Sequence, residues 1–217
     1  MKKNIFVALD FSNFDKALDI ANSVKNDVAG LKITNELFAI CGKEGLKKFS
    51  EFGLEIFLDL KILDIPNTVK KTVASIASLQ TVKYLTIHTS GGDDMLKAAQ
   101  DASGQLELLG VTVLTSQSSS KDQVKLLTNS AIKSKLKGVI ASAQEYESVR
   151  SLSKDLKIFC PGIRGADDKK HDQKRVMSYS EFCKISKDDN KAFAVIGRPI
   201  YEGDASINVK KIINSVK

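Results

Sequence analysis

The feature that most constrains this chain is a regular alternation of short β-branched runs with segments of helical periodicity. Eight runs predict strands and eight segments predict helices, so the 217 residues divide into units of about 27 residues each. A strand followed by a helix, repeated eight times, predicts an α/β fold of the (β/α)8 or TIM barrel type. A doubly wound open sheet is the structural alternative.

The predicted elements follow one another without a linker rich in Pro, Gly or Ser, so we expect a single domain over residues 1–217. The expected strands are Asn4–Asp10, Gly30–Thr34, Leu54–Lys61, Tyr84–Ser90, Leu108–Thr115, Gly138–Ser142, Lys157–Ile163 and Phe193–Gly197. The expected helices are Phe14–Lys25, Glu36–Phe52, Asn67–Leu79, Asp93–Ala102, a stretch near Asn129–Leu136, Ala143–Ser153, Ser180–Ile185 and Ala205–Val216. The polar stretches Gln117–Asp122 and Arg164–Lys174 are expected to be loops on the catalytic face of the barrel.

Composition narrows the class of ligand and the compartment. Lys and Arg number 33 against 26 Asp and Glu, so the formal charge of +7 favours anionic ligands such as phosphates and permits nucleic acid. The three cysteines, Cys41, Cys160 and Cys183, are too few and too far apart for a disulfide framework or a zinc ribbon. No apolar run approaches the roughly 20 residues of a membrane span, and no signal peptide is apparent. We therefore expect a cytoplasmic protein with reduced thiols and no membrane partner.

Charged residues occupy positions of the predicted strands that should face the interior of the barrel. In the third expected strand, alternation places Phe57, Asp59 and Lys61 on one side and the aliphatic residues on the other. Lys32 in the second strand and Asp10 at the end of the first point the same way. Buried charges are costly unless they are paired, and here the signs alternate. A stabilising ion-pair cluster is the alternative, but four charges converging on the functional face favour an active site.

A second group of residues predicts a phosphate site. Barrels often bind phosphate in the loops after the last two strands, and here Gly197 and Arg198 follow the eighth strand while Arg164 follows the seventh. His88 is at an inward-facing position of the fourth strand and is expected to be structural, and His171 is expected to be solvated. Their spacing does not suit a metal, and no cofactor-binding motif occurs.

The segment Asp59–Thr68, with the sequence DLKILDIPNT, resembles the D-x-K-x-x-D-I-P-x-T signature of the orotidine 5′-monophosphate decarboxylase family. Further segments fall in the order that this family shows, so the resemblance extends over almost the whole chain. They are Val7–Asp10, Leu31–Lys32, His88–Gly92, Val113–Ser116, Pro161–Arg164, Asp172–Gln173 and Ile196–Pro199.

The resemblance implies a cofactor-free and metal-free decarboxylation in pyrimidine biosynthesis, with Lys61 as proton donor at C6 of the pyrimidine. It implies that Asp59 and Lys32 complete the charged network, and that Asp64, with Ile65 and Thr68, enters the site of the other subunit of a homodimer. The resemblance further assigns Asp10 and Lys32 to the ribose hydroxyls, Thr115 and Ser116 to the pyrimidine, and Gln173, Gly197, Arg198 and the adjacent Arg164 to the phosphate.

Two other functions remain as alternatives. A 3-keto-L-gulonate 6-phosphate decarboxylase type shares the D-x-K-x-x-D strand but uses Mg²⁺, and it needs a carboxylate where Lys32 stands. A non-catalytic protein that binds phosphate or nucleic acid would account for the positive charge. However, the chain has no Trp and only 4 Tyr, and it lacks the interleaved aromatic and basic residues of a nucleic-acid surface, so no nucleic-acid partner is expected.

Overall fold

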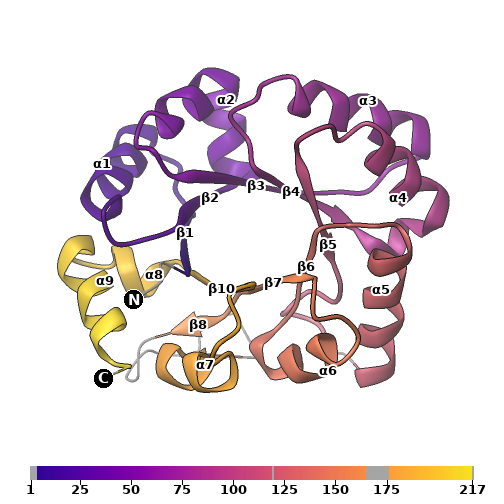
Figure 1. The fold of residues 1–217 in the computed structure, drawn as a ribbon. Helices are drawn as coiled ribbons and strands as arrows, with labels where there is room; N and C mark the ends of the chain where they lie inside the picture. Colours follow the sequence, from indigo (N-terminus) through magenta and orange to yellow (C-terminus); the bar gives the residue numbers. More distant parts are fainter. Residues whose placement is uncertain (1–3, 119, 165–175, 217) are drawn as a thin grey trace.

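Eight parallel strands close into a barrel in the computed structural model, which describes residues 4–118, 120–164 and 176–216. Around the barrel the strands follow the order β1-β10-β7-β6-β5-β4-β3-β2, and every neighbouring pair is parallel. The predicted barrel is therefore confirmed and the open sheet is wrong (Figure 1). The barrel strands are β1 (Ile5–Leu9), β2 (Gly30–Thr34), β3 (Glu55–Ile62), β4 (Tyr84–His88), β5 (Glu107–Val111), β6 (Gly138–Ile140), β7 (Lys157–Cys160) and β10 (Ala192–Ile196).

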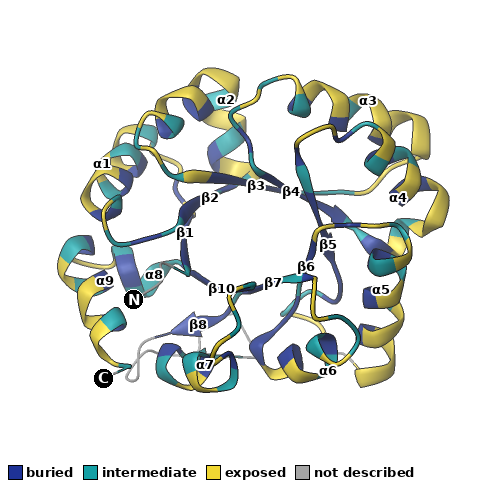
Figure 2. Ribbon diagram, viewed as in Figure 1, coloured by how far each residue is buried: buried dark blue, intermediate teal, exposed yellow. Residues whose placement is uncertain are grey.

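Helices form a ring outside the strands, with their exposed faces outward and their buried faces against the barrel (Figures 1 and 2). Their starts follow local rules: the Asn13 side chain caps α1 by accepting from the Lys16 backbone N–H, and Pro66 opens α3. The helices are α1 (Phe14–Val24), α2 (Asn35–Ser50), α3 (Pro66–Ala77), α4 (Gly92–Asp101), α5 (Lys121–Lys133), α6 (Tyr146–Arg150), α7 (Tyr179–Ile185), α8 (Arg198–Tyr201) and α9 (Ala205–Asn214), with the short 3-10 turns η1 (Thr89–Gly91) and η2 (Ala143–Glu145).

Aromatic side chains fill the barrel interior, so the fold has a solid floor beneath its functional end. The interior cluster contains Phe6, Ala8, Phe57, Tyr84, Leu109, Phe159, Phe193 and Val195. Phe6 lies edge-on to Phe57, Tyr84 and Phe159. A Cβ added at Gly30 would lie 2.3 Å from the Phe6 ring and 2.4 Å from the Glu55 carbonyl oxygen, so only glycine fits where β2 passes these groups.

The alternation predicted for β3 is confirmed over its first half. Phe57 belongs to the interior cluster, whereas Ile56 and Leu58 belong to the larger cluster that packs between strands and helices. Each of the three is at most 1% exposed. The helices therefore bury one face of each strand and the aromatic interior buries the other, which makes the strands rigid supports for residues at their ends.

Three helix predictions are corrected by the structure. The helix expected near Asn129–Leu136 begins at Lys121, because the Ser120 side chain caps it by accepting from the Gln123 backbone N–H. Part of the stretch Gln117–Asp122 is thus helix and not loop. The helix expected at Glu36–Phe52 is interrupted at Gly42, whose φ is 53°. The helix expected at Ala143–Ser153 divides into η2 and α6 and ends at Arg150, whose side chain donates to the carbonyls of Ser153 and Leu156.

Several strands end earlier than expected, and short elements follow two of them near the functional end. After β7 the chain forms the strands β8 (Ile163–Arg164) and β9 (Met177–Ser178), which pair with each other outside the barrel. After β10 it turns at once into α8, so that Arg198 is a helix residue. None of these three elements was predicted from the sequence, because two- to four-residue segments carry no readable periodicity.

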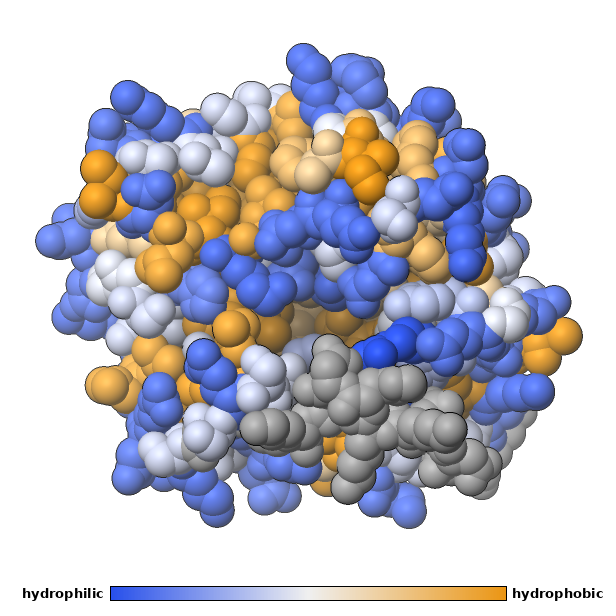
Figure 3. Space-filling model, turned by 180° about the vertical axis from the view of Figure 1, so that it is seen from behind, coloured by the Kyte–Doolittle hydropathy of each residue, from blue (hydrophilic) through white to orange (hydrophobic). Residues whose placement is uncertain are grey.

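The surface seen from behind has an uneven distribution of hydrophobicity (Figure 3). Hydrophilic residues gather across the middle of this face, and apolar patches lie around them. Among the described residues, no helix combines the length and the apolar character that crossing a bilayer requires.

Candidate active site

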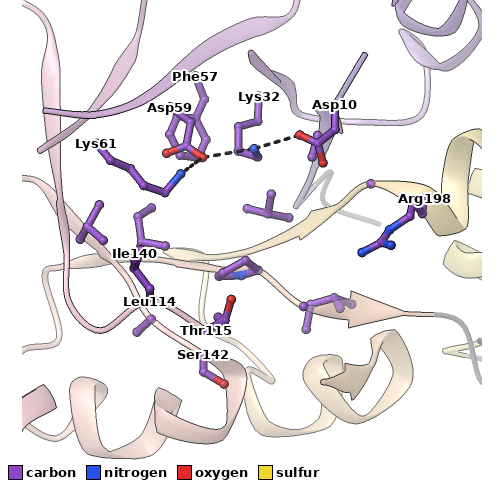
Figure 4. A pocket seen from close by; sticks show the side chains of 18 of the residues that line it. Asp10, Lys32, Phe57, Asp59, Lys61, Leu114, Thr115, Ile140, Ser142 and Arg198 are labelled. Atoms are coloured by element: carbon purple, nitrogen blue, oxygen red, sulfur yellow. Dashed lines mark hydrogen bonds and ion pairs between the residues drawn. The ribbon is translucent and has the colours of Figure 1, made fainter. Parts of the chain in front are cut away.

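One cavity of about 190 Å³ opens where the barrel strands end. Its lining comes from seven of the eight barrel strands or the segments that follow them. Figure 4 shows the charged residues in a row along one side, with Thr115 and Ser142 on the opposite side and Arg198 at one end. The lining residues used below are Asp10, Lys32, Asp59, Lys61, Leu114, Thr115, Ile140, Ser142, Arg164, Gly197 and Arg198.

The charged row brings together the four residues that alternation predicted. The Lys61 Nζ lies 2.8 Å from Asp59 Oδ2, and the Lys32 Nζ lies 3.2 Å from the same oxygen. Lys32 also lies 3.6 Å from Asp10 Oδ1. One carboxylate oxygen thus serves two ammonium groups, and the signs alternate along the row (Figure 4). The predicted convergence of Asp10, Lys32, Asp59 and Lys61 is confirmed.

The strand that carries Asp59 and Lys61 is irregular at this point. Leu58 pairs with Leu85 of β4, but the next pair joins Ile62 with Ile87, so β3 contains extra residues opposite β4. Lys61 has a φ of 49°, a left-handed conformation that is rare for a residue with a side chain. Simple alternation predicted that Asp59 and Lys61 share a side, and the two side chains do meet. The backbone reaches this arrangement through an irregular path that alternation does not describe.

Asp59 is 7% exposed, yet the two lysines keep it ionised. Burial alone would raise the pKa of this carboxyl, but the charges of Lys32 and Lys61, with hydrogen bonds from Lys61 and Thr86, outweigh burial and lower it. At neutral pH the site therefore holds a buried carboxylate between two cations. Such an arrangement provides a fixed negative charge and a cation next to a cavity.

His88 lies at the end of β4, beside the charged row and outside the cavity lining. Burial and the charge of Lys61 lower its pKa, and Asp59 opposes them only in part. The His88 imidazole is therefore neutral at pH 7. His171 lies outside the described residues.

The opposite end of the cavity carries the residues predicted for phosphate. Gly197 caps α8, which begins with Arg198 and Pro199, and both Gly197 and Arg198 line the cavity. Arg164 also lines it and is 6% exposed, from its position in β8. Gln173 lies outside the described residues. Two arginines in the lining of one cavity suit an anion with several oxygens.

The remaining predicted residues divide into two groups. Thr115 lines the cavity, whereas Ser116 is exposed and lies outside the lining. Asp64 and Ile65, on the turn between β3 and α3, and Thr68, in the first turn of α3, are all exposed and outside the lining. The Asp64 carboxylate accepts from the Ile65 backbone N–H at 2.7 Å. The cavity of a single chain thus does not contain these last three residues.

Sequence reasoning missed Ser142 as well as the apolar wall formed by residues such as Leu114 and Ile140. Ser142 is 1% exposed, follows β6, and begins η2 in a reciprocal capping arrangement with Glu145. The S-x-x-E spacing is a readable capping signal, but it predicts a helix start and gives no indication of a cavity.

No group of three or more His, Cys, Asp or Glu side chains is placed to hold a metal ion within residues 4–118, 120–164 and 176–216. The acidic residues at the cavity are separated by Lys32, whose ammonium lies between Asp10 and Asp59. The Lys32 ammonium therefore occupies the position where these two carboxylates could have shared a divalent ion.

Comparison with known proteins gives one consistent result. Residues 3–210 match the model of the orotidine 5′-phosphate decarboxylase / HUMPS family. The orotidine 5′-phosphate decarboxylase of Idiomarina loihiensis is 38% identical over 229 residues, covering 98% of this chain and 97% of that protein. The enzyme of the same name from Wolbachia pipientis is 39% identical, covering 96% of each chain.

Solved structures agree with the sequence matches. The crystal structure of orotidine 5′-phosphate decarboxylase from Lactobacillus acidophilus superposes with a TM-score of 0.82 at 30% identity, covering all of both chains. The orotidine 5′-monophosphate decarboxylase of Methanocaldococcus jannaschii, solved with the inhibitor BMP, has the same fold, with a TM-score of 0.80 at 22% identity and full coverage.

Proposed function

This chain belongs to the orotidine 5′-phosphate decarboxylase / HUMPS family, and from that premise we propose that it decarboxylates orotidine 5′-monophosphate without a cofactor. The product is uridine 5′-monophosphate, and the step belongs to pyrimidine biosynthesis. The observation that carries this proposal is the Asp59 oxygen held between two lysine ammonium groups at the cavity wall.

Lys61 suits the role of proton donor. When the bond between C6 and the carboxyl carbon breaks, CO₂ leaves and the electron pair remains on C6 as a carbanion. An ammonium group at C6 stabilises that charge as it forms and then donates its proton to the carbon. The neutral amine is reprotonated from solvent. Lys61 lines the cavity with its ammonium held by Asp59, so the cation is in place before the charge develops.

Asp59 has two roles in this proposal. It orients the Lys61 ammonium through the 2.8 Å contact. Its negative charge also lies on the cavity wall, where repulsion of the substrate carboxylate would favour CO₂ loss. Lys32 shares the same oxygen and so limits the cost of keeping a second carboxylate nearby.

The substrate-binding roles follow the two ends of the cavity. Asp10 and Lys32, which are paired with each other, are proposed to bind the ribose hydroxyls. Thr115, with Ser116, is proposed to contact the pyrimidine. Arg198 and Gly197 are proposed to bind the phosphate together with Gln173, and Arg164 is proposed to lie beside them. Binding energy from the phosphate, which is far from C6, can then support the reaction at C6.

We further propose a homodimer in which Asp64 completes the site of the other subunit, accompanied by Ile65 and Thr68. The exposed apolar residues beside Asp64 support this arrangement. Leu63 is 56% exposed and Ile65 is 66% exposed, on one short turn directly after the catalytic strand. Apolar side chains at an exposed turn are typical of a protein interface, and a symmetric dimer would give two equivalent shared sites.

A cytoplasmic location is proposed on the basis of the cysteines. Cys41, Cys160 and Cys183 are all free thiols, and Cys160 is fully buried. Burial raises the pKa of the Cys160 thiol, which keeps it protonated and unreactive. Free thiols are typical of reducing compartments.

One assay tests the proposed function. The purified chain is mixed with orotidine 5′-monophosphate, and the change in substrate absorbance is followed with and without exhaustive chelation. We expect turnover at the same rate in both conditions. A rate that chelation abolishes and Mg²⁺ restores would transfer the assignment to the Mg²⁺-dependent alternative. The absence of turnover in both conditions would contradict a decarboxylase of this substrate.

A further inference from the structure

Thr86, in the middle of β4, is fully buried and forms hydrogen bonds with both Asp59 and Lys61 of β3. Its Oγ1 accepts a hydrogen bond from the Lys61 backbone N–H at 2.9 Å. The same hydroxyl donates to Asp59 Oδ1 at 2.9 Å. A hydroxyl has one proton to donate and lone pairs to accept with, so this single group bonds to both catalytic residues at once.

Thr86 stands at the irregularity of β3. Between the pairs Leu58–Leu85 and Ile62–Ile87, three residues of β3 face one residue of β4, and that residue is Thr86. The backbone ladder is interrupted there, and a buried N–H without an acceptor is costly. The Thr86 hydroxyl supplies the acceptor for Lys61, whose φ of 49° persists only where its surroundings hold it.

The hydrogen bond from Thr86 to Asp59 gives the two oxygens of that carboxylate different partners. Oδ1 is occupied by the Thr86 hydroxyl, and Oδ2 faces the two lysines, at 2.8 Å from Lys61 and 3.2 Å from Lys32. A carboxylate can rotate about its last torsion unless one oxygen is held. Thr86 holds that oxygen from a strand that is buried on both faces.

We propose that Thr86 is a positioning residue for the decarboxylation, acting as a clamp that sets the rotation of the Asp59 carboxylate and the backbone position of Lys61. Thr86 lies outside the cavity lining, so it acts only through these two residues. The role rests on the proposed function, because Lys61 and Asp59 matter to turnover only if the site performs this chemistry. Losing the clamp removes none of the side chains that are proposed to bind ribose and phosphate.

The test compares Thr86→Val, which keeps the shape and removes the hydroxyl, with Thr86→Ser, which keeps the hydroxyl. Because small displacements of reacting groups cost about ten- to a hundredfold in rate, we expect kcat of Thr86→Val to fall at least about tenfold. KM should change less than about threefold, and Thr86→Ser should recover most of kcat. The matched control is Thr128→Val in α5, a fully buried threonine whose hydroxyl donates to the Val124 carbonyl of its own helix, and it should leave kcat unchanged.

Hydrogen exchange provides a measurement that does not depend on turnover. In the wild-type protein and in Thr86→Ser, we expect the Lys61 amide to be protected against exchange, because the threonine or serine oxygen accepts from it. In Thr86→Val the protection of this amide should be lost while neighbouring strand amides keep theirs. If Thr86→Val does not fold, the exchange of the wild type and of Thr86→Ser decides the question.

Three outcomes would overturn the clamp: a wild-type Lys61 amide that exchanges as fast as an exposed loop amide, a Thr86→Val enzyme that keeps its kcat, or a Thr86→Ser enzyme as impaired as Thr86→Val. An inactive wild type would contradict the proposed function instead. The exchange data would still test the hydrogen bond from Lys61 to Thr86 in that case.

Discussion

At each end of the barrel a carboxylate lies between two lysines, and the cluster at the end where the strands finish lines the cavity. At the end where strands finish, Asp59 contacts Lys32 and Lys61. At the end where strands begin, Glu107 contacts Lys83 at 2.9 Å and Lys157 at 2.6 Å. Each of these two carboxylates has two lysine partners, so the difference between them lies in geometry and in Asp10, which extends the first cluster.

At the strand-start end, each Glu107 oxygen serves one lysine, and the strands keep a regular register. Lys157 also donates to the Tyr84 hydroxyl, which closes the floor of the barrel. At the catalytic end, two lysines share one oxygen, the strand is irregular, and the cluster lines a cavity. The Asp59 cluster therefore has the features of a functional site, a backbone irregularity and an adjoining cavity, whereas the Glu107 cluster, on regular strands and with Lys83 43% exposed, has those of a stabilising surface cluster.

The largest expected effect separates the two clusters directly. Lys61→Ala should lower kcat at least about a thousandfold, because it removes both the stabilising cation and the proton donor. Lys157→Ala, the matched change at the other end, should keep kcat within about twofold and lower the free energy of unfolding by about 1–3 kcal/mol. Steady-state absorbance assays and thermal unfolding measure both. Lys61→Ala should still bind uridine 5′-monophosphate, as calorimetry can show. A Lys61→Ala enzyme with a tenth of wild-type kcat would break the comparison.

The next prediction separates phosphate binding by Arg198 from the reaction at the charged residues of the same cavity. Arg198→Ala should lower kcat/KM for orotidine 5′-monophosphate about ten- to a hundredfold, because a charge-assisted bond to the phosphate is lost. The phosphate-free nucleoside should react with unchanged kcat/KM. Arg150→Ala, in which a half-buried arginine loses its 2.7 Å ion pair with Asp189 away from the cavity, is the control for general damage. Equal losses for nucleotide and nucleoside would mean that Arg198 acts through the fold.

A third prediction asks whether the catalytic cluster is complete in one chain. Lys61→Ala and Asp64→Ala chains, each inactive alone, are mixed and allowed to exchange subunits. Random pairing makes about half of the dimers mixed, and each mixed dimer has one intact site of two, so activity should return to roughly a quarter of wild type. Mass spectrometry confirms the exchange. If exchange occurs and no activity returns, Asp64 serves its own subunit.

The smallest effect tests the stabilising cluster by pH. Burial would raise the pKa of Glu107, but hydrogen bonds from Lys157 and Lys83 outweigh it, so the pKa lies below its ordinary value of 4.5. A lowered carboxyl pKa contributes stability above the unfolded value and loses it as pH falls through the folded value. Glu107→Gln should therefore be about 1 kcal/mol less stable than wild type at pH 7, and this difference should shrink below about pH 4.5. Denaturant unfolding at several pH values measures it, and a constant difference down to pH 3 would contradict the assignment.

Much of the catalytic cluster was predictable, because its members obey a local rule. Alternation in short strands placed Lys32 and Asp59 toward the interior, and both lie there. The same rule puts Thr86 on the side of Tyr84, but a threonine inside a strand is too common to single out. Its importance comes from the pairing of β3 with β4, where the register slips, and no pattern within either strand reports that slip.

The sequence by itself determined the barrel, the side of each strand that faces inward and the set of charges at its mouth. These depend on periodicity and burial, which act residue by residue along the chain. Only the tertiary structure decided which oxygen of Asp59 meets the lysines and that a helix begins at Arg198 directly after β10. It also decided which threonine bonds to Asp59 and Lys61. Hydrogen bonds depend on distances of a few tenths of an ångström between strands, and those distances are fixed only when the whole sheet closes.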